Sequence, residues 1–100
     1  MFGSKEFIKF AQHAIADYFN KRRDVTGAPE IKPKDVYTVW YSKSLQNHKG
    51  CFSTPVADGM YYEVTYNGDD EVAYLDAYKK WENISISNPA EYLEKKAERS

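Results

Sequence analysis

Apolar side chains recur at helical spacing near the start of the chain. From Phe7 to Phe19 they follow one another at intervals of three and four residues, and polar side chains fill most positions between them. This period gathers the apolar side chains on one face of an α-helix, and Ser4 is a suitable N-cap residue. The pattern predicts a helix over about residues 5–21 whose apolar face, Phe10 included, packs on the rest of the protein.

Aromatic and β-branched residues dominate the next patterned stretch, residues 35–43, and predict the first β-strand. Both faces of this strand are largely apolar, which is more typical of a central strand than of an edge strand. Residues 44–50 have the composition of a turn. A second, short strand is expected over residues 51–54, followed by a third over about residues 60–66 in a simple meander.

Asn67-Gly68 is the strongest hairpin signal in the chain because apolar runs flank it on both sides. It predicts a type I′ turn, in which Gly68 has a positive φ. The segment 71–83 fits either a strand or a helix, since its apolar residues occur at both spacings. We favour a strand through about Asp76, paired with the preceding strand across the turn.

These elements predict one domain over the 100 residues. Its fold class is α+β: an N-terminal amphipathic helix, a connector over residues 22–34, and a three- to four-stranded antiparallel sheet over about residues 35–78. The pair Asn88-Pro89 is typical of a helix start. A short C-terminal helix is therefore expected within an appendage of residues 84–100.

The charge of the chain is small overall but uneven. The formal net charge is −1. Residues 1–34 hold seven Lys/Arg and four Asp/Glu, which gives a local charge of +3. Residues 35–100 hold seven Lys/Arg and eleven Asp/Glu, which gives a local charge of −4. A general nucleic-acid binder is usually strongly basic, so the balance argues against that class. Weak nucleic-acid binding remains the alternative, and its candidate residues, beside exposed tyrosines that stack on bases, are Lys21, Arg22, Arg23, Lys32 and Lys34.

Cysteine and histidine are scarce in this sequence. A single Cys51 and the absence of a signal-like segment suggest a reducing, cytoplasmic setting. His13, His48 and Cys51 do not make a zinc set, so we expect neither a metal nor a cofactor. A small enzyme that uses Cys51 and His48 is the less favoured hypothesis, since a buried strand cysteine and a solvated turn histidine explain both residues. Other candidate catalytic groups are the carboxylates of Asp58, Glu63, Asp69 and Asp76.

The chain contains a set of short motifs: Trp40, Lys43, Leu45-Gln46-Asn47, Ser53-Thr54, Asp58-Gly59, Tyr61-Tyr62-Glu63, Thr65-Tyr66-Asn67-Gly68-Asp69 and the segment 74–80. Together they resemble a family of small proteins of unknown function carried by phages and prophages of Gram-positive bacteria. The resemblance covers about residues 35–83 and, more loosely, the first helix. It implies an accessory protein of a phage that acts in the bacterial cytoplasm on host machinery, defence systems included, by binding rather than by catalysis.

Two surfaces are therefore candidates for binding a host protein in an anti-defence or anti-CRISPR-like role. One is the turn 43–49, with two lysines, amides and an exposed leucine, although Leu45 could equally fill the core. The other is the acidic turn 69–71, either a polar hairpin cap or, with Glu63 and Asp76, a mimic of phosphates. The residues are Lys43, Leu45, Gln46, Asn47, His48, Lys49, Asp69, Asp70 and Glu71. Free sheet edges also make a homodimer possible.

Overall fold

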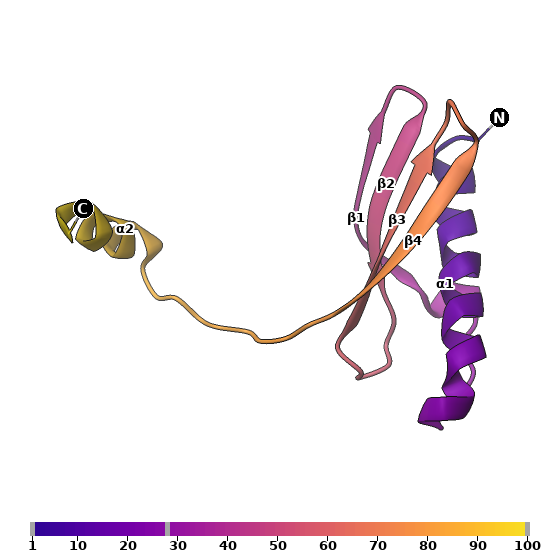
Figure 1. Ribbon diagram of the computed structural model, residues 1–100, viewed down its shortest axis with the longest axis horizontal. Coiled ribbons are helices and arrows are strands. Elements are labelled where there is room, and N and C mark those ends of the chain that lie inside the picture. Colours follow the sequence, from indigo (N-terminus) through magenta and orange to yellow (C-terminus); the bar gives the residue numbers. More distant parts are fainter. Residues whose placement is uncertain (1, 28, 100) are drawn as a thin grey trace.

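Four antiparallel strands form one sheet with the order β1-β2-β3-β4, and a long helix covers one of its faces (Figure 1). The computed structural model describes residues 2–27 and 29–99. The α+β meander predicted from the sequence is thereby confirmed. The elements are α1 (Ser4–Thr26), a short 3-10 helix η1 (Pro33–Asp35), β1 (Tyr37–Ser44), β2 (Asn47–Ser53), β3 (Met60–Asn67), β4 (Val72–Lys79) and α2 (Pro89–Arg99).

Helix α1 begins and ends at glycines. Gly3, and not Ser4 as predicted, is the N-cap, and its N–H donates to the Glu6 carboxylate at 2.9 Å. This hydrogen bond holds the pKa of the exposed Glu6 below its usual value. Gly27 ends the helix in the left-handed conformation at φ 74°. The helix is therefore longer than the predicted residues 5–21, because its polar last turns have no breaker before Gly27.

The core lies between α1 and the sheet. Phe7, Ala11, Ile15 and Phe19 form the buried line of the helix, with successive members four residues apart. The prediction that Phe10 is buried was wrong: its side chain is 39% exposed beside this line, where its ring lies 6.2 Å from that of Phe2. The sheet and connector contribute Ile31, Val36, Phe52, Tyr62 and Val64 to the core.

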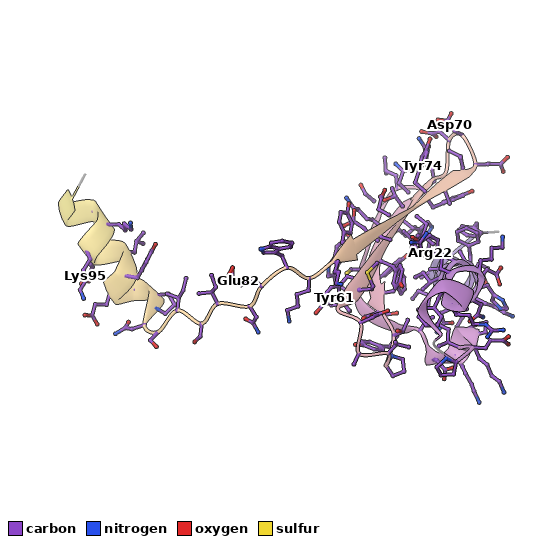
Figure 2. All side chains as sticks on the ribbon, turned by 60° about the horizontal axis from the view of Figure 1, so that its bottom comes forward. Arg22, Tyr61, Asp70, Tyr74, Glu82 and Lys95 are labelled. Carbon is purple, nitrogen blue, oxygen red and sulfur yellow. The ribbon has the colours of Figure 1, made fainter. Side chains whose placement is uncertain are left out.

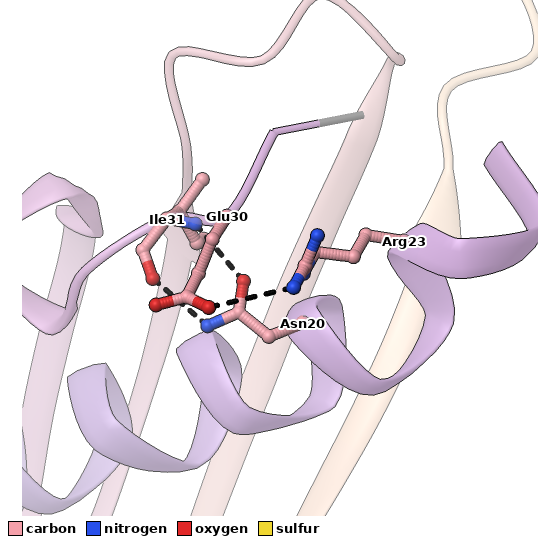
Figure 3. A network of polar contacts seen from close by, with 4 residues as sticks. All are labelled: Asn20, Arg23, Glu30 and Ile31. Carbon is pink, nitrogen blue, oxygen red and sulfur yellow. Dashed lines mark hydrogen bonds and ion pairs between the residues drawn. The ribbon is translucent and has the colours of Figure 1, made fainter. Parts of the chain in front are cut away.

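The connector returns along the helix and is held there by a side chain of α1. The Asn20 amide donates to the carbonyl oxygen of Ile31 and accepts from its N–H, both at 2.9 Å (Figure 3). A nearby ion pair joins Arg23 to Glu30 at 3.6 Å. The two hydrogen bonds satisfy the backbone N–H and C=O groups of Ile31, as a neighbouring strand would, and the Ile31 side chain is buried. The residues between the helix and the sheet are thus part of the packed structure.

Strand β1 lies at an edge of the sheet, which corrects the prediction of a central strand. Its register on β2 shifts between Thr38 and Trp40, an irregularity common at sheet edges. The apolar residues on its second face are exposed and have no second layer over them. The sequence therefore has apolar residues on both faces of β1, although only the face with Tyr41 packs on α1 and the other face, with Tyr37 and Trp40, is exposed.

The two hairpin turns differ from the predictions. The first contains only Leu45 and Gln46, so β2 begins at Asn47, earlier than predicted. The second spans residues 68–71, and its left-handed residue is Glu71, with φ 51°, so the type I′ turn with positive φ at Gly68 was wrong. The Asn67 side chain instead accepts from the N–H groups of Asp69 and Asp70 at 3.0 and 3.2 Å.

The segment after this turn is a strand, as we favoured. β4 pairs with β3 without a break from Asn67↔Val72 to Met60↔Lys79. An extended segment then leads to α2, which stands apart from the sheet (Figure 1). Asn88 caps α2 by accepting from the Glu91 N–H at 3.4 Å, so the predicted C-terminal helix is present. Among the described residues, neither helix has the length and apolarity needed to cross a membrane.

Candidate functional site

The two surfaces predicted separately lie together at one end of the sheet. The β1–β2 turn and the β3–β4 turn are neighbours because the strands follow one another in a meander. Figure 2 shows Asp70 at this end, far from the linker that carries Glu82. We call the surface formed by the two turns the hairpin tip: Leu45, Gln46, Asn47, Asp69, Asp70 and Glu71.

Hydrogen bonds join the two turns into one unit. The side-chain amide of Gln46 donates to the carboxylate of Asp69. The N–H of Gly68 donates to Asn47 Oδ1 at 2.9 Å. Because these bonds involve both turns, the amides and acids of the tip have a fixed spacing relative to each other. A rigid surface loses less entropy when it binds a partner.

Leu45 is the apolar centre of the tip. Its side chain is 82% exposed, so the alternative that it fills the core is wrong. Its φ of 56° is in the left-handed region, which costs a leucine roughly 1 kcal/mol. Two-residue hairpin turns require such a conformation, but glycine or asparagine usually supplies it, so a leucine at this position is unusual. The tip thus presents an exposed apolar side chain beside three acidic residues.

His48 does not belong to this surface. The sequence placed it in a solvated turn, but it lies in β2 with only 2% of its surface exposed. Its Nε2 lies 3.2 Å from the carbonyl oxygen of Phe2, which can only accept, and its Nδ1 lies 2.6 Å from the Tyr41 hydroxyl. Nε2 therefore donates to Phe2, and Nδ1 accepts from Tyr41. The Phe7 ring stacks on the imidazole at 5.2 Å, so His48 holds the N-terminal segment against the sheet.

The two lysines predicted beside the turn are exposed but lie on opposite faces. Lys43 pairs with His48 and so points to the α1 side, near the tip. Lys49 is on the face away from α1, where its Nζ lies 3.3 Å from Glu63 Oε1. Of the nine predicted partner-binding residues, six form the tip, Lys43 borders it, and His48 and Lys49 lie elsewhere.

Cys51 and His48 are not arranged as a catalytic pair. They are three residues apart in β2, so their side chains project from opposite faces of the sheet. Burial raises the pKa of the Cys51 thiol, and the nearby Glu63 carboxylate raises it further, which disfavours the reactive thiolate. Within residues 2–27 and 29–99, no group of three or more His, Cys, Asp or Glu side chains is placed to hold a metal ion.

Two of the candidate carboxylates lie opposite one another on adjacent strands. Glu63 of β3 pairs with Asp76 of β4 on the face away from α1. Asp69 is at the tip, and Asp58 is in the β2–β3 loop, where it accepts from the Met60 N–H at 3.0 Å. The four carboxylates therefore occupy three separate places, and the proposed phosphate mimic of residues 69–71 with Glu63 and Asp76 is not one continuous cluster.

A pocket of about 300 Å³ opens between the second half of α1 and the sheet. Arg22, which Figure 2 labels, is one of its lining residues. The Arg22 guanidinium lies 5.4 Å from the centre of the Tyr18 ring. Burial raises the pKa of Tyr62, and the Asp58 carboxylate raises it further, so the phenol stays neutral. The lining residues are Tyr18, Phe19, Arg22, Asp58, Met60, Tyr62 and Lys79.

The basic residues proposed for nucleic-acid binding have different neighbours. Arg22 borders this pocket, Arg23 is paired with Glu30, and Lys21 is exposed on the helix. Sequence reasoning missed two other features: the pocket itself, and the exposure of the large apolar residues after β4. The sequence could have indicated this exposure, because Trp81, Ile84 and Ile86 come after the last predicted strand and lie outside the predicted sheet.

A family model matches most of the chain. It is described as a family of unknown function (DUF6275), and it covers residues 8–88. The match includes nearly all of α1, the complete sheet and the linker, and it ends just before α2. No curated protein matches the chain with significance, and neither does any solved structure.

Proposed function

This chain belongs to the family of unknown function DUF6275, and we propose that it is a small accessory protein that binds a bacterial protein through the hairpin tip. In this proposal it inhibits or modulates its partner in the bacterial cytoplasm without catalysis. The observation that carries the proposal is Leu45, an exposed leucine in a left-handed conformation in the first of the two turns that hydrogen bonds join.

The chemistry of the tip suggests the form of the partner surface. Leu45 requires a small apolar pocket, and Asp69, Asp70 and Glu71 favour Lys or Arg around it. Anchors in apolar pockets supply most of the affinity in protein interfaces, and surrounding charges mainly set specificity and association rate. We therefore expect a hydrophobic anchor site on a basic protein surface.

A component of host defence is the partner class that we propose. Its support is the resemblance of the Trp40, Leu45-Gln46-Asn47 and Tyr74–Lys80 motifs to small phage and prophage proteins. A protein that acts on nucleic acid has a basic surface, which suits an acidic tip. Inhibition would then follow from occupation of that surface.

The proposal is tested by capture of partners from infected or defence-expressing bacteria. The tagged wild-type protein is compared with Leu45→Asn and with a variant in which Asp70 and Glu71 become Asn and Gln. Matched controls away from the tip are Val39→Thr, at an exposed apolar residue of β1, and a variant with Glu82→Gln and Glu94→Gln. We expect one protein to be recovered with the wild type and both controls, and lost with both tip variants.

Recovery that is equal in all five proteins would contradict the tip as the binding surface. Recovery of nucleic acid alone, released by moderate salt, would favour the alternative that uses the basic residues of α1 and the connector. Turnover of a small molecule by the purified protein would exclude a purely binding role.

A further inference from the structure

Within residues 2–27 and 29–99, no helix or strand packs over one face of the sheet, which we call the open face. Helix α1 covers the other face, and Figure 2 shows Tyr61 and Tyr74 on the sheet along the uncovered side. Strand register places five aromatic side chains on this face, and four of them are roughly half exposed. These four are Tyr37, Trp40, Tyr74 and Tyr78. Such a group of exposed aromatic residues is typical of an interaction surface.

The described part of the chain also carries large apolar side chains that are exposed and lie away from the sheet and α1. They lie in the C-terminal arm, residues 81–99, which Figure 1 shows extending away from the sheet. Trp81 is 95% exposed, and Ile84 and Leu93 are each 69% exposed. The radius of gyration is 17.7 Å, whereas a compact chain of this length has about 13 Å. The arm therefore exposes the kind of side chains found in interfaces, and it extends away from the sheet instead of packing on it.

Both parts of the arm have a pattern that predicts packing. Ile84-Ser85-Ile86-Ser87 alternates apolar and polar residues, as a half-buried extended segment does. In α2, Ala90, Leu93 and Ala97 recur at three- and four-residue spacing along one side. The family match includes residues 81–88, so the extended part belongs to the shared family unit.

The course of the chain after β4 favours another molecule as the site of packing. The Lys80 N–H donates to the Gly59 carbonyl oxygen at 2.7 Å, which continues the β3–β4 ladder to the end of the strand. Residues 80–88 contain neither glycine nor proline to reverse the chain. Nine extended residues span about 30 Å. The arm thus leads outward far enough to reach the sheet of a neighbouring copy.

We propose that the arm of one copy lies across the open face of a second copy, with the exchange reciprocated about a two-fold axis. Trp81, Ile84 and Leu93 then cover Tyr37, Trp40, Tyr74 and Tyr78 of the other chain. Each sheet gains a second layer, with α1 on one face and the exchanged arm on the other. This arrangement differs from the edge-to-edge dimer that the free strands suggested.

The area available is sufficient for a stable dimer. The exposed Trp, Tyr, Ile and Leu side chains of one arm present on the order of 500 Å². Reciprocal exchange buries this area twice, together with matching area on both sheets, so that roughly 2,000 Å² is removed from solvent. Stable interfaces bury about 1,200–2,000 Å². The arm leaves the sheet at the end opposite Asp70 (Figure 2), so both hairpin tips stay exposed.

Sedimentation of the full-length protein tests the exchange. We expect a mass of about twice 11.6 kDa at 50 μM for the wild type. The double variant Ile84→Asp, Ile86→Asp is expected to sediment as a monomer. The control Ser85→Asp, Ser87→Asp adds the same charge on the polar side of the arm and is expected to stay dimeric. A monomeric wild type, or a dimer unaffected by the isoleucine changes, would overturn the proposal.

Crosslinking shows whose sheet the arm covers. Cys51, the only cysteine, lies on the open face, and Ser87→Cys adds a second thiol in the arm. Because the raised pKa of Cys51 slows its reaction, a short bis-maleimide is applied in a long incubation. It is expected to give a covalent dimer on a denaturing gel, and less of it when Cys51→Ser is added. A crosslinked monomer, in which the arm folds back on its own sheet, would overturn the exchange. This outcome does not depend on whether the hairpin tip binds a host protein.

Discussion

Gly68 donates its backbone N–H to Asn47 Oδ1 at 2.9 Å, so that the second turn rests directly on the first. The approach is close: a Cβ built on Gly68 would lie 2.3 Å from the carbonyl oxygen of Gln46. A backbone atom cannot move away as a flexible side chain can. The glycine is therefore required by space, and not by the left-handed conformation that Asn67-Gly68 suggested.

Gly68→Ala is expected to destabilise the protein by about 1–3 kcal/mol, because the new methyl group forces the turns apart. The midpoint of urea unfolding measures the change. If Gly68→Ala has the wild-type midpoint, the two turns are not in contact.

Replacement of Phe7 and of Phe10 by alanine should have different effects. Phe7 is completely buried, so Phe7→Ala should reduce the free energy of unfolding by about 3–5 kcal/mol. Phe10 is 39% exposed, and Phe10→Ala should cost clearly less. Denaturant unfolding of both variants measures the difference. The reverse order would mean that α1 is rotated from the position described above.

Tyr41→Phe removes the hydroxyl that His48 Nδ1 accepts from. The imidazole is buried, so its nitrogen would then lack a hydrogen bond, at a cost of about 1–3 kcal/mol. Thermal unfolding can measure this loss. A suitable control is Tyr37→Phe, because Tyr37 is half exposed and its hydroxyl can bind water. Equal losses in the two variants would show that His48 is not held by Tyr41.

The regular elements were predictable because their patterns are local. The spacing from Phe7 to Phe19 indicates α1, and the aromatic and β-branched runs indicate the strands. The burial of single residues was harder to predict. His48 and Phe10 were misplaced because burial depends on strand register and on the direction in which the helix faces, and both are set by tertiary packing.

The candidate site was predicted in two pieces. Residues 43–49 and 69–71 were both identified, but nothing local indicates that they meet. Their contact follows from the strand order, which places the β1–β2 and β3–β4 turns at the same end of the sheet. The turn geometry was predicted wrongly, and the reason is related. The space at Gly68 is limited by Gln46, which is distant in sequence, so no local pattern shows why a glycine is needed there.

The reactivity of Cys51 should be low at neutral pH. Burial and Glu63 raise the pKa of its thiol, so the thiolate is scarce there and increases only as the pH rises above the usual range of a cysteine. Alkylation by iodoacetamide should therefore be slower than that of a free cysteine at pH 7.5, and should accelerate at higher pH. Rapid, pH-independent alkylation near neutrality would indicate an activated thiol.

Leu45→Asn separates binding from stability. Asparagine tolerates the left-handed conformation, so the variant should unfold at the wild-type urea concentration or slightly above it. The same change removes the apolar side chain from the tip. Loss of stability would instead show that Leu45 packs in the fold.

The most direct test of the tip is calorimetric titration of the captured bacterial protein, once purified, with the wild type and Leu45→Asn. We expect one binding site per tip and an affinity at least tenfold weaker for the variant, which is a loss of about 1.4 kcal/mol in binding free energy. Equal affinities for the two proteins would contradict binding through Leu45 of the hairpin tip.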